Sequence, residues 1–189
     1  MQPGVERELI QKCRNGDARF YEPIVRAYEP QGYRMALGMT GNPDDARDAL
    51  QEAFVKAYQA LSRFDTRRSF GPWFFQILRN QCRDLLRSRT SRFRVEVVDD
   101  DLLDLQADTG PGSSRRDRER AEARRLLWAA LERVPDEQRE ILVLKELEGF
   151  RYQEIASILE IPEGTVASRL YHARRALQDA LADMGAEYP

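Results

Sequence analysis

The sequence predicts an all-α protein in which a flexible linker joins an N-terminal helical bundle to a C-terminal helix-turn-helix module. Apolar residues recur at helical spacing along almost the whole chain, and alternating strand-like runs are nearly absent. The helical pattern fails only over residues 93–118, and a length of 189 residues suits one domain or two small ones. We therefore expect domains at 1–92 and 119–185, with the linker at 93–118.

In the N-terminal block, the helix ends are marked by capping residues. Asn42 can cap a helix whose first turn holds Pro43 and two acids, and Ser69 can cap another with Pro72 in its first turn. The pattern predicts helices over residues 5–13, 18–28, 31–39, 42–61 and 69–89. The buried stripe of the 42–61 helix should consist of Ala46, Ala49, Leu50, Ala53, Phe54, Ala57 and Leu61.

The linker separates this block from the C-terminal helices. Residues 99–101 are three aspartates and residues 109–114 are rich in Gly, Pro and Ser, a composition typical of flexible segments. We expect proteases to cut first between about Asp99 and Arg118. Beyond the linker, the pattern predicts helices over residues 118–131, 135–149, 152–159 and 163–177.

The last two predicted helices form a helix-turn-helix pattern. Residues 160–162 break the first helix, and the second begins near Glu163. Ala156 is small where two steeply crossing helices must approach closely, and Ile161 and Val166 would fill the gap between them. A short helix, a tight turn and a second helix is the arrangement that places the second helix in the DNA major groove.

The outward side of that second helix carries hydrogen-bond donors and cations, and no acid occurs between Glu163 and Asp179. Arginine can bond guanine in two places, and Ser or Thr can hold a phosphate. An ordinary solvated helix face is the alternative, but the preceding helix and turn favour DNA contact. The donors and cations are Thr165, Ser168, Arg169, Tyr171, His172, Arg174 and Arg175.

Charge is distributed unevenly along the chain. The formal net charge is only -2, yet residues 63–94 hold nine arginines against two acids, a local net charge of +7. Residues 95–108 hold six acids and no base. This asymmetry indicates a localised anionic partner that the average charge hides.

Several classes of protein are disfavoured. With His172 as the one histidine, a two-histidine zinc motif is impossible, and no Gly-rich phosphate loop occurs. We therefore expect no enzyme activity, no metal and no cofactor. Cys13 and Cys82 lie in apolar helical patterns, which favours buried reduced thiols over a disulfide. Without a membrane-spanning run or a signal pattern, we expect a cytoplasmic protein with no membrane insertion.

Two segments near the C-terminus carry a family resemblance. Residues 131–156 and 161–177 closely resemble the C-terminal domain of extracytoplasmic-function (ECF) sigma factors, initiation subunits of bacterial RNA polymerase. The chain departs from the family pattern at Glu160, where the family often has glycine and a positive φ would cause strain. It also departs at Ala167, where the family often has Lys or Arg, so one phosphate or base contact is missing.

The N-terminal half supplies an independent resemblance. Residues 44–61, Phe64 and residues 69–87 look like sigma domain two, so the resemblance covers nearly the whole chain except the linker. It implies that 1–92 is sigma domain two, which binds core polymerase and recognises and melts the minus-ten element. It also implies that 119–185 is sigma domain four, which recognises the minus-thirty-five element.

Opening a promoter requires trapping unstacked bases on aromatic or arginine faces. Phe64, on a predicted loop, is the best candidate to touch a flipped base, whereas Trp73 and Phe74 could equally be core residues at helical spacing. By resemblance, the Phe64 loop and Asn80 form the base pocket. Arg67 and Arg68 are better read as phosphate neutralisers. The predicted minus-ten residues are Phe64, Arg67, Ser69, Phe70, Trp73, Asn80, Arg83, Asp84 and Arg87.

The 42–61 helix has an acidic outer face that would repel DNA and attract a basic protein surface. A solvated acidic face is the alternative. By resemblance, this helix docks on the coiled coil of the polymerase beta-prime clamp. The predicted core-polymerase residues are Asp45, Asp48, Gln51, Glu52, Phe54 and Lys56.

The resemblance implies a complete scheme without covalent chemistry. Domain two grips core polymerase and the melted non-template strand. Domain four reads duplex DNA and touches the beta flap, through Thr165, Ala167, Ser168, Arg169, Tyr171, His172, Arg174 and Arg175. An anti-sigma factor is implied and could hold the protein at the membrane until a stress releases it to the nucleoid. The acidic linker could mimic nucleic acid or simply be solvated. The alternative function is a stand-alone helix-turn-helix regulator acting as a dimer.

Overall fold

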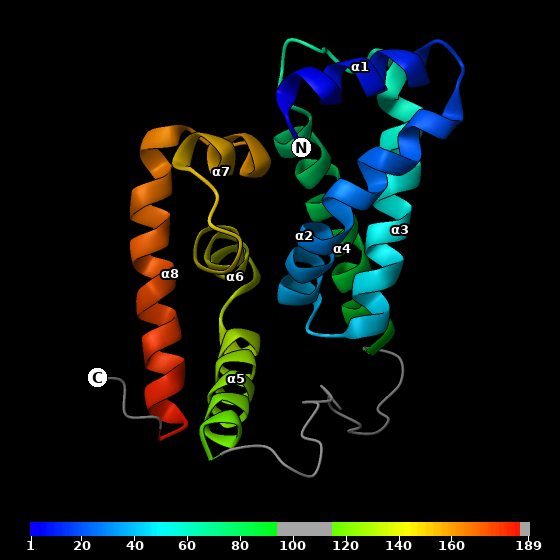
Figure 1. The fold of residues 1–189 in the computed structure, drawn as a ribbon. Helices are drawn as coiled ribbons and strands as arrows, with labels where there is room; N and C mark the ends of the chain where they lie inside the picture. The colour runs from blue at the N-terminus through cyan, green and yellow to red at the C-terminus, as the bar shows by residue number, and fades with distance from the viewer. Residues whose placement is uncertain (94–114, 186–189) are drawn as a thin grey trace.

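The computed structural model describes residues 1–93 and 115–185, and it contains no strand within these ranges (Figure 1). The N-terminal block comprises α1 (Pro3–Arg14), η1 (Ala18–Phe20), α2 (Tyr21–Thr40), α3 (Pro43–Ala60), η2 (Leu61–Arg63) and α4 (Phe70–Phe93). The C-terminal block comprises α5 (Arg115–Arg133), α6 (Asp136–Leu142), η3 (Val143–Leu147), α7 (Tyr152–Leu159) and α8 (Glu163–Asp183). The all-α prediction is confirmed. Within the described ranges, no helix is long and apolar enough to cross a membrane.

One helix boundary in the N-terminal block was predicted wrongly. Residues 18–20 form η1, and the rest of the two helices expected at 18–28 and 31–39 is one continuous helix, α2, with Pro30 inside it. Proline in a helix interior removes one backbone hydrogen bond but does not forbid the helix where packing on both sides holds it. Ile24 and Met35, one on each side of Pro30, are both fully buried, so tertiary packing overrides the local signal. The predicted stop is correct, because Gly41 has φ 67° and its N–H bonds to Leu37 O.

The predicted start and buried face of α3 are both confirmed. Asn42 Oδ1 accepts hydrogen bonds from the backbone N–H groups of Asp44 and Asp45 at 2.9 and 3.1 Å. This side-chain cap satisfies donors that the first helical turn leaves without intrahelical partners. All seven residues of the predicted stripe are buried, at Ala46, Ala49, Leu50, Ala53, Phe54, Ala57 and Leu61. The stripe packs α3 against α2 and α4.

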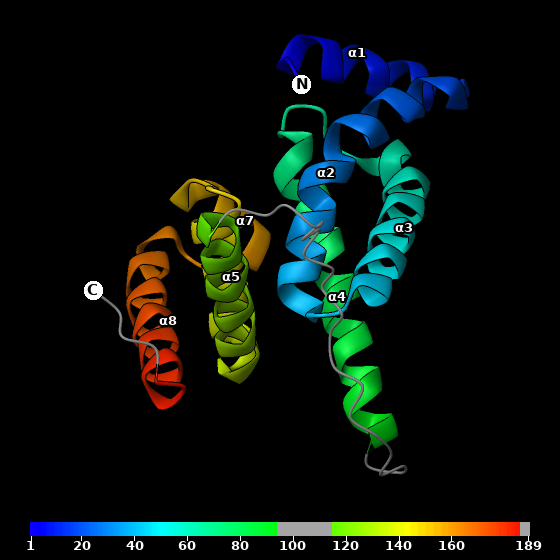
Figure 2. The same cartoon turned by 60° about the horizontal axis from the view of Figure 1, so that its bottom comes forward.

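The C-terminal block contains the predicted helix-turn-helix in α7 and α8. Val166 is fully buried between the helices, and Ile161 N–H bonds to Ala156 O, which holds the turn against the end of α7. Glu160 adopts a left-handed conformation with φ 56°, as the glycine-like position in the turn requires. Figures 1 and 2 show α5 and α8 running side by side below this turn.

The two blocks pack directly against each other, which the sequence did not predict. One hydrophobic core runs through both blocks, and α2 and α4 contact α6, η3 and α7. At this junction the rings of Phe75 and Phe150 meet edge to face, with 5.0 Å between their centroids. The predicted linker core, including residues 99–101 and 109–114, lies outside the described residues. Helix α5 begins at Arg115, slightly before the expected restart at residue 118.

Candidate nucleic-acid and protein interfaces

Helix α8 separates an apolar side from a polar side along its first four turns. Val166, Leu170 and Ala173 are buried against the rest of the block. Helical periodicity therefore turns the intervening polar positions to solvent. Thr165 is half-buried, and the other seven predicted minus-thirty-five residues are exposed: Ala167, Ser168, Arg169, Tyr171, His172, Arg174 and Arg175. The structure thus brings all eight predicted residues onto one outward-facing surface, the α8 face.

Two residues of the α8 face have fixed side chains. The Arg174 guanidinium donates from Nε and Nη2 to Glu146 Oε1 at 2.9 and 2.7 Å, and Glu146 lies on η3. Ser168 Oγ donates to Thr165 O at 3.0 Å. The Tyr171 and His172 rings meet edge to face, with Tyr171 61% exposed. An exposed aromatic ring among cations is suited to contacts with sugars and thymine methyl groups in a groove.

The aromatic cluster at the start of α4 is core rather than surface, which corrects two predicted contacts. Phe64 is 5% exposed and lies between Phe70 and Trp73, with centroid distances of 5.8 and 4.6 Å. Phe70 is fully buried and stacks on Phe74. Burying large rings is more favourable than leaving them in the loop, so neither Phe64 nor Phe70 offers a free face here. Trp73 is half-buried. Phe74 is fully buried, which agrees with the alternative that it is a core residue.

Further along α4, four predicted minus-ten residues share one face. They follow i, i+3, i+4, i+7 spacing and line a hollow of about 360 Å³: Asn80, Arg83, Asp84 and Arg87. Asn80, Asp84 and Arg87 are exposed. Arg83 is only 27% exposed, because its guanidinium faces Glu140 of the C-terminal block at 3.5 Å. The surface has both the cations and the amide that binding a separated strand would use.

The loop before α4 is held by a short-range ion pair. The Arg67 Nε and Nη2 groups donate to Asp65 at 3.0 and 2.8 Å, and the Arg67 backbone N–H also donates to Asp65 Oδ1. These hydrogen bonds lower the pKa of Asp65 to about 2. Arg67, Arg68 and Ser69 are exposed, so this loop presents donors to solvent before the start of α4.

Helix α3 turns its acidic side outward as predicted, with one correction. Asp48, Gln51, Glu52 and Lys56 are exposed. Phe54 instead points into the core and stacks on Phe74, with centroids 4.5 Å apart. Asp45 is half-buried, because it lies in the first turn under the Asn42 cap.

The acidic side of α3 continues onto α4. Lys56 Nζ donates to Gln81 Oε1 at 2.7 Å and so ties the two helices together. A hollow of about 440 Å³ lies beside this bridge and is lined by Asp48, Ala49, Gln51, Glu52, Val55, Gln81, Asp84 and Leu85. Three carboxylates line it, so Asp84 takes part in this hollow as well as in the α4 hollow.

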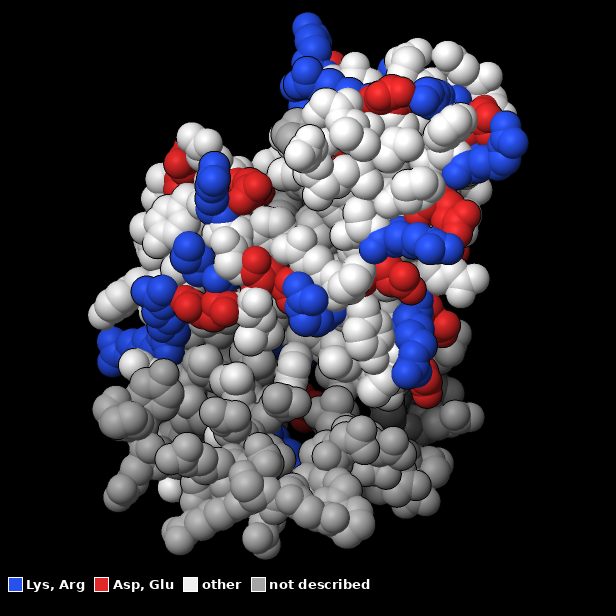
Figure 3. Space-filling view, in the orientation of Figure 1, with Lys and Arg blue, Asp and Glu red and all other residues white. Residues whose placement is uncertain are grey.

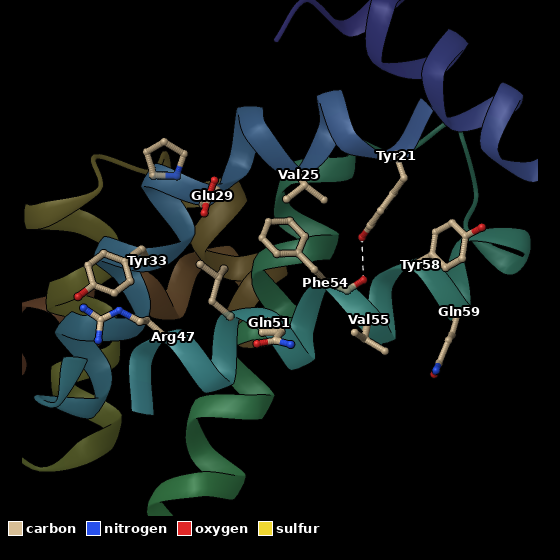
Figure 4. A pocket seen from close by; sticks show the side chains of 12 residues that line it. Tyr21, Val25, Glu29, Tyr33, Arg47, Gln51, Phe54, Val55, Tyr58 and Gln59 are labelled. Carbon is tan, nitrogen blue, oxygen red and sulfur yellow. Dashed lines mark hydrogen bonds between the residues drawn. The ribbon is translucent and has the colours of Figure 1, made fainter. Parts of the chain in front are cut away.

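A larger apolar groove between α2 and α3 was not anticipated from the sequence (Figure 4). It has a volume of about 970 Å³, with Phe54 at its floor and Tyr58 at one end. Tyr21 Oη donates to Phe54 O at 2.8 Å, which fixes the wall of the groove. Val55 and Tyr58 are 43% and 40% exposed. Both lie outside the predicted buried stripe of the helix, and this was the sequence feature that could have indicated the groove.

The α8 face and the outer side of α3 differ in charge. In Figure 3, blue side chains gather along the edge formed by α8, whereas blue and red alternate over the side formed by α2 and α3. Within residues 1–93 and 115–185, no cluster of His, Cys, Asp or Glu could hold a metal ion. Cys13 and Cys82 are separate buried thiols, as the sequence favoured.

Comparisons with known proteins match both blocks. Residues 24–92 match the family described as Sigma-70 region 2, and residues 124–177 match Sigma-70, region 4. The ECF RNA polymerase sigma factor SigW of Bacillus subtilis is 30% identical over 182 residues, covering 94% of this chain and 97% of its own. The RNA polymerase sigma-H factor of Pseudomonas aeruginosa is 29% identical over 184 residues, covering 93% of both chains.

Two solved structures have a similar fold. The sigma factor RpoE in complex with the anti-sigma factor NepR from Bartonella quintana gives a TM-score of 0.67 at 25% identity, covering 86% of this chain and 96% of that one. CnrH in complex with the cytosolic domain of CnrY gives a TM-score of 0.69 at 24% identity, covering 95% and 98%. The match along both blocks disfavours a stand-alone helix-turn-helix regulator.

Proposed function

The chain belongs to the ECF sigma factors of bacterial RNA polymerase, and from this premise we propose how its surfaces divide the work of initiation. A sigma factor binds core polymerase and directs it to promoters. We propose that residues 1–92 form the block that grips polymerase and the opened strand. Residues 119–185 form the block that recognises duplex DNA, and residues 93–118 connect them. Limited proteolysis that cuts first between residues 99 and 118 would support these boundaries, and early cleavage inside α3 would contradict them.

The α8 face is the proposed reader of the minus-thirty-five element. Its position as the second helix of a helix-turn-helix supports insertion into the major groove. Arg169 and Arg175 are exposed and can bond guanine edges or phosphates, while Ala167 contributes only a methyl group. The loop at Arg67–Ser69 and the α4 hollow are the proposed contacts of the minus-ten element. Phe64 and Phe70 enter this scheme only as core residues that support the loop.

The acidic side of α3 is the proposed dock for the beta-prime clamp coiled coil. Asp48 and Glu52 lie one turn apart and are exposed, and Gln51 lies between them. A cationic partner surface would gain from these charges, whereas DNA would be repelled. We assign contact with the polymerase beta flap to the C-terminal block.

One observation carries the proposal. The chain places an exposed basic helix face and an exposed acidic helix face on separate blocks, so that duplex DNA and a basic protein surface have different binding sites. The direct experiment is reconstitution with core polymerase from the same organism, followed by mapping of transcription starts on genomic DNA. Defined starts that depend on the added chain are expected, and their absence at every site would refute the proposal.

A charge reversal tests the polymerase dock. Asp48→Lys with Glu52→Lys should reduce core binding in a pull-down by at least about 100-fold, because two attractive interactions become repulsive. The matched control is Glu8→Lys with Glu22→Lys, which reverses two exposed acids elsewhere in the same block. Equal capture of core polymerase by both double variants would remove α3 from the dock.

An anti-sigma factor is a further proposed partner. RpoE of Bartonella quintana was solved with the anti-sigma factor NepR, and the apolar groove adjoins the α3 dock through Gln51 and Val55, which line both hollows. A partner that filled the groove would therefore block the polymerase. Such a partner could also hold the chain at the membrane and release it to the nucleoid. Competition between core polymerase and a co-purified partner tests this, and simultaneous binding of both would contradict it.

A further inference from the structure

A buried polar contact joins α1 to α2 at the end of the N-terminal bundle where α4 begins (Figures 1 and 2). Tyr28 Oη on α2 donates a hydrogen bond to Glu6 Oε1 on α1 at 2.5 Å. Glu6 is only 8% exposed, because it lies one turn before the buried Ile10 on the face that packs α1 against the bundle. Burial, and then the bond to Glu6, raise the pKa of the Tyr28 hydroxyl, so this group remains a hydrogen-bond donor.

Local stability does not explain a carboxyl group at this position. Such a group loses its water on burial, and the loss is offset only where its new hydrogen bonds are well formed. An apolar residue at position 6 would instead continue the face formed by Leu9, Ile10 and Cys13. Replacing both partners of a buried hydrogen bond by apolar groups can be nearly neutral for the free energy of unfolding. The hydrogen bond adds a fixed position for the Tyr28 hydroxyl, and therefore for its ring.

The Tyr28 ring packs against the first turns of α4. Its centroid lies 5.3, 5.8 and 5.9 Å from the ring centroids of Phe70, Phe74 and Phe75. Gly71 is buried beside it, and a Cβ atom at Gly71 would lie 3.3 Å from both Cε1 and Oη of Tyr28. Carbon atoms normally pack at about 3.5–4.0 Å, so the backbone of Gly71 lies unusually close to the tyrosine. The position of Tyr28 thus sets the position of the start of α4.

The start of α4 in turn holds the loop at residues 64–69. Phe64 packs on Phe70 and Trp73, with centroid distances of 5.8 and 4.6 Å. At the other end of the loop, α1 packs against η2, the turn that leads into Phe64. Both ends of the loop are therefore anchored, one by α1 and the other by rings that pack on Tyr28. The exposed donors of the loop are Arg67, Arg68 and Ser69.

We propose that Glu6 and Tyr28 are positioning residues for promoter opening, which hold the loop at residues 64–69 in the geometry that receives the opened strand. They act through the aromatic rings of α4 and touch no nucleotide themselves. Helix α1, which lies outside the residues 24–92 matched by the family model, thereby becomes part of the promoter-opening machinery. This role rests on the proposed function of the loop, whereas the packing that fixes the loop does not.

The first test removes the hydrogen bond and measures promoter opening. Tyr28→Phe keeps the ring and loses the donor, and Glu6→Leu loses the acceptor while keeping an apolar face on α1. With polymerase reconstituted from each variant, 2-aminopurine fluorescence in the minus-ten region follows opening at a mapped start. The opening rate should fall on the order of tenfold, as expected when one hydrogen bond to a carboxyl group is lost. Capture of core polymerase in a pull-down should stay unchanged, because the α3 dock keeps all its residues.

A conservative substitution separates positioning from simple support of the fold. Glu6→Gln keeps an oxygen that can accept the same hydrogen bond, so the opening rate should stay within about twofold of the wild-type rate. If the pair only supported the fold, variants of equal stability would open promoters equally fast, and urea unfolding measures that stability. The matched controls are Glu8→Leu, at an exposed position of the same helix, and Tyr33→Phe, the same substitution further along α2.

The free chain supplies an independent measurement of the loop. Trp73 packs on Phe64, and the chain has two tryptophans, so Trp128→Phe leaves Trp73 as the sole indole fluorophore. In this background, Tyr28→Phe and Glu6→Leu should each raise the acrylamide quenching constant of Trp73 by about twofold, because the rings around it are held less firmly. Glu6→Gln should leave that constant unchanged.

A steric variant tests the same position without removing a polar group. Gly71→Ala adds a Cβ at 3.3 Å from the Tyr28 hydroxyl, which must then move by a few tenths of an ångström. Opening should slow by about threefold, because the bond to Glu6 is distorted rather than lost. The control is Gly4→Ala on α1, where nothing lies within 4 Å of the added Cβ. Because Gly71 lies on a third helix, loss of folding in one variant leaves the others to decide.

The outcomes separate this role from the proposed function. Normal opening by Tyr28→Phe and Glu6→Leu, with a wild-type chain that initiates, would overturn the positioning role alone. Equal slowing by Glu6→Gln and Glu6→Leu would also overturn it, because the hydrogen bond would then not be the cause. Failure of the wild-type chain to initiate at any site would refute the proposed function. Unchanged Trp73 quenching in Tyr28→Phe and Glu6→Leu would show, without any polymerase, that the pair does not fix the loop.

Discussion

The two helix faces proposed to contact DNA are built differently. On α8, the apolar residues point inward and most of the polar ones are exposed. Arg174 is paired, but with Glu146 of the same block, so the face is complete within its own block. On α4, the aromatic residues are taken up by the core of the N-terminal block, and Arg79 and Arg83 face Glu140 of the other block. The contrast teaches that one helix face can be complete within its own block, whereas another shares its charged residues with a neighbouring block.

The largest effect should come from the free face. Arg169→Ala or Arg174→Ala should each cost roughly 1–3 kcal/mol at the upstream element if the residue reads a base. Affinity for wild-type and mutated upstream duplexes, measured with the reconstituted polymerase, separates base reading from phosphate contact. Gln178→Ala is the control, because Gln178 is exposed on the same helix beyond the polar cluster. Full affinity in both arginine variants would break the comparison by removing α8 from DNA.

A smaller effect should come from the α4 face, and its size should depend on whether Glu140 is present to face Arg83. Arg83→Ala should weaken oligonucleotide binding by the wild-type chain very little, since Glu140 already faces Arg83. In the Glu140→Gln background the same substitution should cost about 1 kcal/mol more, a coupling that a double-mutant cycle measures. Arg68→Ala, an exposed arginine of the neighbouring loop, should show no such dependence. Additive costs for Arg83 and Glu140 would mean that the two faces are equally free.

The rigidity of the duplex reader can be adjusted at its turn. Glu160 has φ 56°, so Glu160→Gly should stabilise the chain by about 0.5–1 kcal/mol by relieving backbone strain. Gly149→Ala is the opposite change at φ 70°, where an added Cβ meets no atom within 4 Å, and should destabilise by about 1 kcal/mol. Urea unfolding followed by tryptophan fluorescence measures both. A loss of stability in the Glu160→Gly variant would show that the turn carries no strain.

The smallest effect concerns Cys82, which lies on α4 near the junction. Burial first, and then the charge of Glu140, raise the pKa of this thiol to about 12. A raised pKa favours the neutral folded form, so its contribution is complete below the unfolded pKa of 9.0 and is lost as the pH rises toward 12. At pH 9.5 the loss should still be less than about 1 kcal/mol. Cys82→Ala should remove this part of the decrease in the free energy of unfolding at alkaline pH, whereas Cys13→Ala should remove less. An equal pH dependence in both variants would contradict the attribution to Cys82.

Much of the fold followed from local signals. The Asn42 cap, the α3 stripe and the inward residues of α8 depend on helical periodicity and capping, which act within a few residues. Pro30 was misread, because packing of the α2 residues on both sides of it outweighs one missing hydrogen bond. Phe64 and Phe70 were expected to contact DNA but are buried in the core. The sequence cannot tell whether an aromatic residue in a loop or at a helix start packs against DNA bases or against other core rings.

The candidate site was predictable on one block and only partly on the other. The polar residues proposed on α8 were found from helical periodicity, whereas Ala167 came only from the family resemblance. Glu140 was missed, because an acid in an amphipathic helix looks the same whether it meets water or an arginine from 61 residues away. The apolar groove was missed too, because its walls come from two helices whose separation the sequence does not specify.

The sequence by itself determined the helices, the helix-turn-helix and the family, because these depend on residue periodicity and on contiguous motifs. Only the tertiary structure decided that the two blocks dock, that Gly38 receives Val143 and that Glu140 covers the arginines of α4. The physical reason is distance along the chain: helical patterns repeat every few residues, whereas these contacts join side chains that become neighbours only when separate helices pack.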